Sequence, residues 1–147
     1  MKIRIRSLEG AILHEPQCPT YAIRIYNSEK MFGKEEAERA RKPLRPSLNY
    51  NTIIGYEFDD IDPGNIRGVL FDEKIAKKII EDFELNKKSC EELLVYCMLG
   101  RNRSPAVAIA LNEIFSLGEN PDLLKLIYRF YTRHVYQTMI EATKRNG

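Results

Sequence analysis

The sequence predicts a single α/β domain over residues 1–147, with a central, mostly parallel sheet flanked by helices. Short runs rich in β-branched and aromatic residues alternate along the chain with segments whose apolar residues recur at helical spacing. The run 93–96 is apolar throughout, which is typical of a strand in the middle of a parallel sheet. A length of 147 residues also fits one domain with one core.

Four segments have the composition of strands. They cover residues 1–6, 20–26, 51–58 and 93–96. The first alternates charged and apolar side chains, as strands do, and it lacks the apolar core of a signal peptide. The second, TYAIRIY, is rich in β-branched and aromatic residues. Pro43 and Pro46 interrupt the chain between the second strand and the third.

Segments that favour helices lie between the second and third strands, between the third and fourth strands, and after the fourth strand. Residues 34–42 are charged and helix-prone, and Asp72 is a suitable N-cap for a following helix with one apolar face. Residues 105–115 are apolar nearly all round, which indicates a buried helix. Gly118 is expected to end that helix.

A last helix is expected to begin at Asn120 and Pro121 and to run toward residue 144. Asparagine at the N-cap and proline in the first turn are both favoured at a helix start. The residues expected to face inward are Leu123, Leu124, Ile127, Phe130 and Tyr131.

The composition argues against several classes of protein. No apolar run approaches the roughly 18 residues needed to cross a bilayer, so no membrane association is expected. A net charge of +2 argues against a strongly basic nucleic-acid-binding protein. Three cysteines do not make a paired disulfide framework, and no cysteine and histidine lie at zinc-site spacing. We therefore expect a cytoplasmic protein without a metal or organic cofactor.

The segment CMLGRNRSP, residues 97–105, lies between the buried strand and the buried helix. Ligands of parallel sheets bind beyond the carboxyl ends of the strands, where this segment is expected. A tight loop there can turn its backbone N–H groups inward as an anion-binding nest, and the helix N-terminus adds further donors. Gly100 permits a backbone conformation that a side chain would oppose.

Three side chains of this segment suit phosphoryl transfer. Arg103 offers a planar fork to two phosphate oxygens. Cys97 lies in the positive field of the helix end, which favours a reactive thiolate. Ser104 can donate a hydrogen bond to the sulfur and ease its later departure. A buried core cysteine is the plainer interpretation, but it leaves the arrangement of Gly100, Arg103 and Ser104 to coincidence.

The pattern Cys-x5-Arg-Ser with a central glycine resembles the phosphate loop of the protein tyrosine and dual-specificity phosphatases, most of all their compact microbial members. The resemblance covers residues 50–116 well. It implies a phosphotyrosine-phosphatase-like fold and a phosphatase that acts through a cysteinyl-phosphate intermediate on a phosphorylated protein or a small phosphoester. It implies Cys97 as nucleophile, Arg103 as phosphate clamp and Ser104 as the supporting hydroxyl. The residues expected to bind the substrate phosphate are Met98, Leu99, Gly100, Arg101, Asn102 and Arg103.

Two features depart from the family pattern. Histidine usually precedes the cysteine, and this chain has Tyr96 there. Arg101 and Asn102 are bulkier and more polar than the family's usual residues. Tyr96 keeps open a second hypothesis, a non-catalytic, phosphate-binding pseudophosphatase. A second Cys-x5-Arg pattern, from Cys18 to Arg24, has a proline, no glycine and no following serine, so we reject it.

The general acid is expected in the acidic, turn-rich loop after the third strand. Residues 53–60 resemble the family strand that delivers this aspartate, and the alignment places Asp60 at the acid position. Asp62 and Asp59 remain alternatives. The carboxylic acid would protonate the leaving oxygen and would then take a proton from the hydrolytic water.

Other reactive side chains have plainer interpretations. His14 and His134 are expected to be packing or surface residues. Cys90 could trap oxidised Cys97 as a disulfide, although a cysteine without a role is the simpler interpretation. A rhodanese-like sulfurtransferase would not usually have a Gly-x-x-Arg-Ser-Pro loop, and low-molecular-weight tyrosine phosphatases place their cysteine near the N-terminus.

Overall fold

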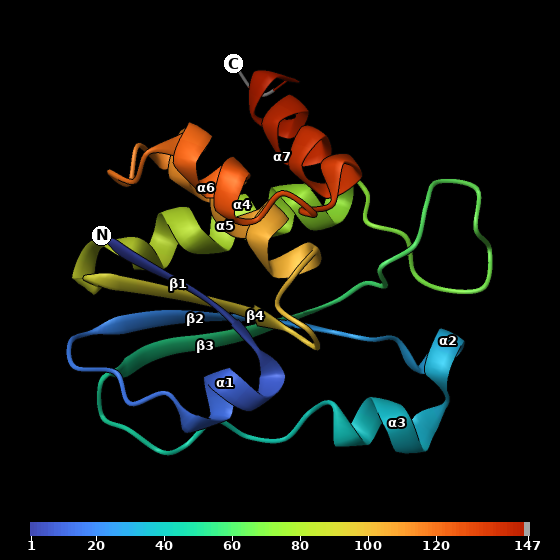
Figure 1. Ribbon diagram of the computed structural model, residues 1–147, viewed down its shortest axis with the longest axis horizontal. Helices are drawn as coiled ribbons and strands as arrows, with labels where there is room; N and C mark the ends of the chain where they lie inside the picture. The colour runs from blue at the N-terminus through green and yellow to red at the C-terminus, as the bar shows by residue number, and fades with distance from the viewer. Residues whose placement is uncertain (146–147) are drawn as a thin grey trace.

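The computed structural model describes residues 1–145 and has a four-stranded sheet at its centre (Figure 1). The strands are β1 (Lys2–Ser7), β2 (Thr20–Tyr26), β3 (Tyr50–Glu57) and β4 (Glu92–Cys97), in the spatial order β1-β4-β2-β3. All neighbouring pairs are parallel, so the four carboxyl ends lie at one edge of the sheet. The predicted α/β class is confirmed, and the sheet is wholly parallel.

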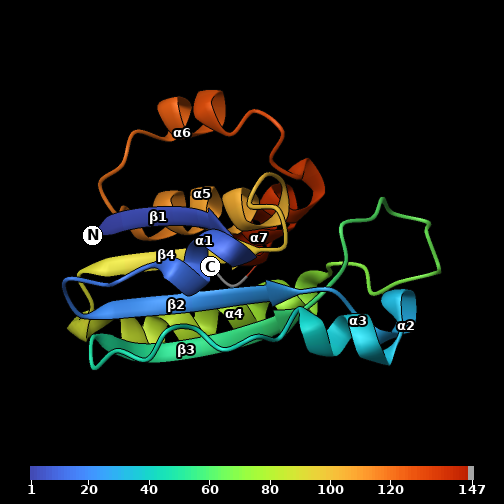
Figure 2. The same cartoon turned by 60° about the horizontal axis from the view of Figure 1, so that its bottom comes forward.

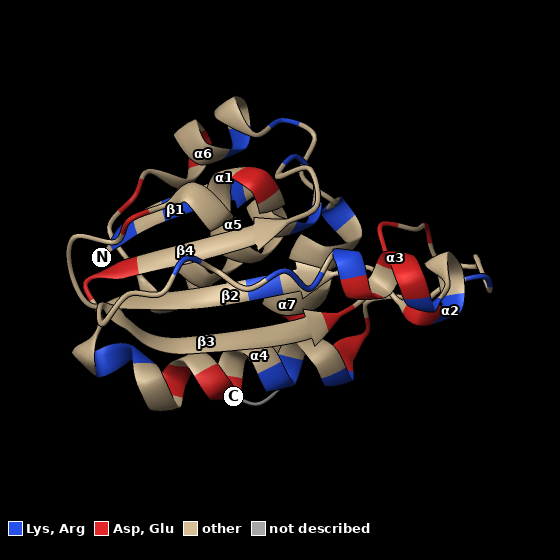
Figure 3. Cartoon of the chain, turned by 90° about the horizontal axis from the view of Figure 1, so that it is seen from below, with Lys and Arg blue, Asp and Glu red and all other residues tan. Residues whose placement is uncertain are grey.

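Helices cover both faces of this sheet (Figures 1 and 2). The helices are α1 (Leu8–Leu13), α2 (Glu29–Phe32), α3 (Lys34–Arg39), α4 (Glu73–Asn86), α5 (Arg103–Phe115), α6 (Pro121–Ile127) and α7 (Arg133–Arg145), with a 3₁₀ turn η1 (Lys87–Ser89). On one face α4, α5 and α7 pack together, and α6 lies on the outer side of α5. The other face carries α1, and α2 and α3 extend beyond the carboxyl ends of the strands (Figure 3).

Strand β4 lies between β1 and β2 in the sheet, and all six of its residues are buried. Leu93, Val95 and Cys97 join the larger core under α4, α5 and α7. Leu94 and Tyr96 point to the opposite face and join a smaller cluster beside α1. This division follows from the alternation of side chains along a strand.

Two predicted helices of the larger layer are present. The side chain of Asp72 accepts a hydrogen bond from the N–H of Ile75 at 2.9 Å and caps α4, as predicted. Helix α5 is buried on all sides from Arg103 to Asn112. Gly118 does not end α5: the helix stops at Phe115, and Ser116 takes the left-handed conformation with φ 51°.

The prediction of one long C-terminal helix is wrong. The chain leaves the helix after Ile127 and re-enters it at Arg133, so residues 128–132 form a loop between α6 and α7. Only Tyr131 of the five residues expected to face inward is buried, and Phe130 is 64% exposed. The break brings this loop against the segment that follows β4. There the carbonyl of Phe130 and the N–H of Thr132 form hydrogen bonds with Asn102.

Short elements were not predicted. Helices α1 and α2 have six and four residues, too short for a periodic pattern. Their N-cap serines, Ser7 and Ser28, each accept a hydrogen bond from a backbone N–H three residues on, and these serines were the available signal. Among the described residues, no helix is both long and apolar enough to cross a membrane.

Candidate active site

The loop of residues 98–102 joins β4 to α5 at the carboxyl edge of the sheet. Its strand lies between β1 and β2, and Cys97 is the register partner of Ser7 at the end of β1. The predicted position of the loop, between a buried strand and a buried helix, is therefore observed. Such a place, beyond the carboxyl ends of parallel strands, is where ligands of open α/β sheets bind.

Gly100 is the residue that lets this loop close. Its φ is 72°, a left-handed conformation that side chains oppose. A Cβ atom there would lie 2.7 Å from the backbone carbon of Arg6 and 2.7 Å from the backbone nitrogen of Ser7. The loop is also tied to the chain after β1, because the N–H of Leu8 donates to the carbonyl of Met98 at 3.3 Å.

The sulfur of Cys97 is the point on which the loop converges. The Cys97 side chain is only 3% exposed and faces α5. Its Sγ lies 3.2 Å from Oγ of Ser104, and the N–H of Gly100 donates to it at 3.3 Å. The sulfur therefore has a hydroxyl and a backbone amide within hydrogen-bond distance.

The N-terminus of α5 faces the same loop. Its N-cap residue, Asn102, makes no capping hydrogen bond with its side chain. The amide Nδ2 of Asn102 instead donates to the carbonyl of Phe130 at 2.6 Å. N–H groups of the first turn of α5 thus have no side-chain cap, and together with the helix dipole they favour an anion at this end.

Arg103 is buried, with 5% of its surface exposed, and its Nη1 donates to the carbonyl of Phe58 at 2.8 Å. Within residues 1–145 no carboxylate forms an ion pair with it. A buried guanidinium without a counterion is electrostatically ready to bind an anion. The contact with Phe58 also joins the loop after β4 to the acidic loop after β3.

The three candidate aspartates have different surroundings. Asp59 is buried, and its carboxylate accepts hydrogen bonds from the N–H and the hydroxyl of Ser28 and from the N–H of Val69. These three hydrogen bonds tie the acidic loop after β3 to Ser28 and Val69. Asp62 is exposed in the segment between β3 and α4, which projects away from the sheet (Figure 1).

Asp60 is linked to the loop 98–102 through Thr132. It is exposed, and it follows Phe58, the residue that Arg103 holds, by two positions. Its Oδ1 accepts a hydrogen bond from the hydroxyl of Thr132 at 3.4 Å. The N–H of Thr132 in turn donates to the carbonyl of Asn102 at 3.0 Å. The loop 128–132 therefore belongs to this site, and sequence reasoning missed it.

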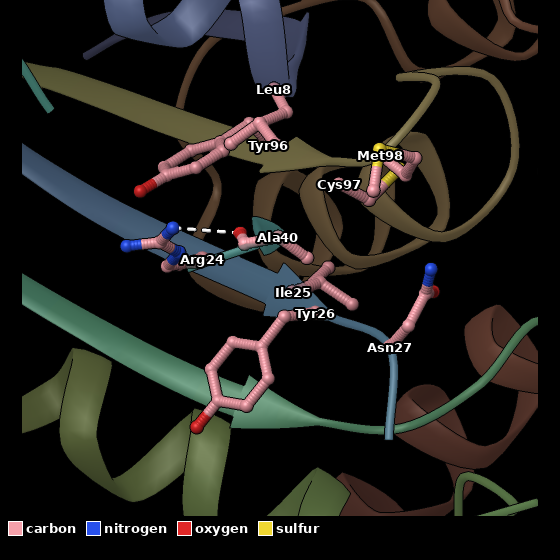
Figure 4. A pocket seen from close by; sticks show the side chains of 9 residues that line it. All are labelled: Leu8, Arg24, Ile25, Tyr26, Asn27, Ala40, Tyr96, Cys97 and Met98. Atoms are coloured by element: carbon pink, nitrogen blue, oxygen red, sulfur yellow. Dashed lines mark hydrogen bonds between the residues drawn. The ribbon is translucent and has the colours of Figure 1, made fainter. Parts of the chain in front are cut away.

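The side chain of Tyr96 does not lie beside the side chain of Cys97. It points to the opposite face of the sheet, where the guanidinium carbon of Arg24 lies 5.9 Å from its ring centre. Burial raises the pKa of its hydroxyl, which has no hydrogen-bond partner in the described part of the chain. With Cys97, Met98 and Arg24 it lines a narrow pocket (Figure 4). Tyr96 can therefore influence Cys97 only through the packing of the strand end.

The two histidines lie outside this site. His134 contacts the carbonyl of Phe71 at 2.8 Å. His14 contacts the buried carboxylate of Glu92, at the amino-terminal end of β4, at 3.2 Å. Burial alone would raise the pKa of Glu92, but hydrogen bonds from Arg4, Thr20 and His14 outweigh it and lower that pKa.

Cys90 is also remote, so the idea that it traps oxidised Cys97 is wrong. The extended strand β4 separates them, and its six residues alone, Glu92–Cys97, span roughly 17 Å. Over residues 1–145, the structure has no group of three or more His, Cys, Asp or Glu side chains arranged to hold a metal ion.

Comparisons by sequence identify no relative: no family model and no curated protein matches the chain. Among solved structures, the crystal structure of Tk-PTP in the active form matches over 96% of this chain and 92% of its own. The TM-score is 0.52 and the sequence identity is 14%. Tk-PTP is a protein tyrosine phosphatase. At this identity the likeness shows the fold, an α/β domain of the tyrosine-phosphatase type.

Proposed function

We propose that the protein is a cysteine-dependent phosphatase of the tyrosine or dual-specificity type, formed by residues 1–147 as one domain. Its substrate would be a phosphorylated protein or a small phosphoester, and it would act in the cytoplasm, where thiols stay reduced. The observation that carries the proposal is the convergence of Ser104 Oγ and the Gly100 N–H on Cys97 Sγ. A core cysteine needs no such donors.

Binding would use the positive end of the site. The phosphate would lie over the loop 98–102, with its oxygens accepting from backbone N–H groups and from the first turn of α5. Arg103, which has no carboxylate partner among the described residues, would turn its fork to two of these oxygens. The N-terminus of α5 and Arg103 would also stabilise the negative charge on the phosphoryl oxygens in the transition state.

In the first chemical step, Cys97 Sγ would attack phosphorus in line with the leaving oxygen. The S–P bond forms as the P–O bond breaks, and Asp60 donates its proton to the leaving oxygen. A phenolate leaving group has a pKa near 10, so protonation at neutral pH lowers the barrier. Asp59 would hold the acidic loop in place through its bonds to Ser28 and Val69.

In the second step, water would attack the cysteinyl phosphate. Asp60, now a carboxylate, takes a proton from this water, and the electron pair of the S–P bond returns to sulfur. The hydroxyl of Ser104 donates to that departing sulfur at the observed distance of 3.2 Å. The products are inorganic phosphate and the starting enzyme, and no metal is needed.

The second candidate function is a phosphate-binding module without efficient turnover. Tyr96 favours it, because the side chain on the strand before Cys97 has no polar contact that could orient the loop. The two functions differ only in turnover, since both require the loop and Arg103.

The deciding experiment measures hydrolysis of para-nitrophenyl phosphate over about pH 5 to 8 in the presence of a chelator. The variants are Cys97→Ser and Asp60→Asn, with Cys18→Ser as the matched control from the rejected second pattern. Turnover lost in Cys97→Ser and kept in Cys18→Ser supports the phosphatase. An inert wild type that still binds vanadate supports the binding module, and a protein that neither turns over nor binds vanadate refutes both.

A further inference from the structure

Two cysteines that the proposed chemistry does not use lie at the opposite edge of the sheet. Cys18 comes two residues before β2, and Cys90 comes two residues before β4. These strands are neighbours, and their starts lie side by side in both views of the ribbon (Figures 1 and 2). Both cysteines are free thiols.

The backbone brings the two cysteines near each other. Thr20 and Glu92 are register partners, and the N–H groups of Glu91 and Glu92 both donate to the carbonyl of Pro19, at 2.8 and 3.2 Å. Cys18 directly precedes Pro19 and Cys90 directly precedes Glu91, so the hydrogen bond from the Glu91 N–H to the Pro19 carbonyl holds the two cysteines near each other at the starts of the two strands. A disulfide between them requires Cα atoms about 4.4–6.8 Å apart.

The two cysteines share one place at the surface. Cys18 and Cys90 both line one open surface pocket, together with Met1 and Leu117. Burial raises the pKa of the Cys90 thiol and outweighs hydrogen bonds with Ser89 and Asn51 that would lower it. Cys18 is partly exposed, whereas Cys90 is buried.

We propose that Cys18 and Cys90 form a reversible disulfide when the protein meets a low-molecular-weight disulfide such as oxidised glutathione. Cys18, the more exposed thiol, attacks first: its bond to one glutathione sulfur forms, the glutathione disulfide breaks, and one glutathione thiol leaves. The sulfur of Cys90 then attacks that of Cys18 and releases the second glutathione thiol. Two protein thiols lose two electrons and two protons, and oxidised glutathione gains both.

The bond would join the starts of β2 and β4 and close a loop that contains β2, β3 and α4. Closing a loop of this length restricts the unfolded chain and stabilises the fold. Cys97 would stay outside the reaction, because β4, whose six residues span roughly 17 Å, separates it from Cys90. Its contacts with Ser104 and Gly100 are unchanged by a bond at the far edge. The pair is thus a modification site separate from the catalytic thiol.

The test treats the wild-type protein with oxidised glutathione, blocks the remaining thiols with an alkylating agent and maps the peptides by mass spectrometry. We expect a monomer that has lost two hydrogens, with the Cys18 and Cys90 peptides linked and Cys97 alkylated under denaturing conditions. The midpoint of thermal unfolding should rise by roughly 10 °C and should fall back when dithiothreitol is added.

Variants separate this result from other oxidation. Cys97→Ser should form the same link with the same thermal shift. Cys90→Ser should instead keep a stable glutathione adduct on Cys18, because the second attack is missing. Alkylation of both Cys18 and Cys90 in the oxidised wild type, a link that includes Cys97, or a link between two molecules would each overturn the proposal. The readouts are mass and unfolding temperature, so the result does not depend on the proposed phosphatase activity.

Discussion

Replacing Gly100 with alanine tests whether the loop after β4 is held as closely against β1 as the structure shows. Two costs arise. A left-handed φ costs a residue with a side chain about 1–2 kcal/mol, which is partly offset by about 0.4–1 kcal/mol because alanine restricts the unfolded chain. The new Cβ would also lie 2.7 Å from backbone atoms of Arg6 and Ser7, which cannot rotate away as a side chain could. Overpacking of this kind costs about 1–3 kcal/mol.

Gly118→Ala is the matched control for the conformational cost. Gly118 also has a positive φ, 107°, but a Cβ there would meet nothing within 4 Å. We expect Gly118→Ala to lower the free energy of unfolding by about 1 kcal/mol and Gly100→Ala by about 2–4 kcal/mol. Urea denaturation followed by circular dichroism measures both, and the difference between the two variants isolates the clash with β1.

Activity should separate the two variants further. To relieve the clash, the loop must move away from β1 and carry the N–H of Gly100 away from the sulfur of Cys97, which it contacts at 3.3 Å. A displacement near 1 Å at a reacting group costs about 10²-fold in rate. We expect kcat/KM to fall by about that factor in Gly100→Ala and to stay within twofold of wild type in Gly118→Ala. Equal stability losses together with unchanged turnover in Gly100→Ala would refute the close approach.

Three further predictions concern carboxylates and Tyr96. Asp59→Asn should lower the free energy of unfolding by about 2–3 kcal/mol, because an amide cannot accept all three hydrogen bonds. Asp60→Asn should leave stability unchanged and lower kcat by about 10²-fold or more, and the reverse pattern would exchange the roles of these aspartates. The pKa of Glu92 is lower in the folded protein than in the unfolded chain. The Glu92 carboxylate therefore contributes its full stabilisation of the fold above the unfolded pKa of about 4.3, and this stabilisation is lost as the pH falls through the folded pKa. Glu92→Gln should therefore flatten the acid side of the stability curve from urea denaturation, and an unchanged curve would contradict this. Tyr96→Phe should change the free energy of unfolding by less than about 1 kcal/mol and leave kcat/KM near wild type, because the hydroxyl has no partner in the described chain; a large loss of activity would show that the hydroxyl acts on Cys97.

The sequence predicted the sheet and the two elements that hold the loop 98–102 well because their signals are local. The apolar run 93–96 and the buried helix from 105 specified the two elements that hold the loop, and Asp72 marked the start of α4. Parallel pairing followed from the alternation of strands and helices. These elements depend on composition over four or more residues, which periodicity detects.

The roles of individual polar residues were harder to predict, because burial is a tertiary property. Asp59 and Asp60 are adjacent in an acidic loop, and nothing in their sequence indicates that one is buried by Ser28 and Val69 while the other is exposed. The amphipathic pattern of residues 121–144 was equally misleading. It contains no glycine or proline after Pro121 to mark the break at 128–132.

The break after α6 links the two halves of the site. Asn102 holds the loop 128–132 by two hydrogen bonds, one to the carbonyl of Phe130 and one from the N–H of Thr132, and the Thr132 hydroxyl reaches Asp60. Arg103 holds the same acidic loop from the other side through the carbonyl of Phe58. A phosphate bound by Arg103 would compete with the carbonyl of Phe58 for the N–H groups of Arg103. Binding would therefore weaken the link from Arg103 to Phe58 and leave the link from Thr132 to Asp60. Asp60, the proposed acid, would then keep its position relative to α5 through Thr132 while the end of β3 adjusts. The break between α6 and α7 is therefore compatible with the site, because it places Thr132 in the loop that makes this link.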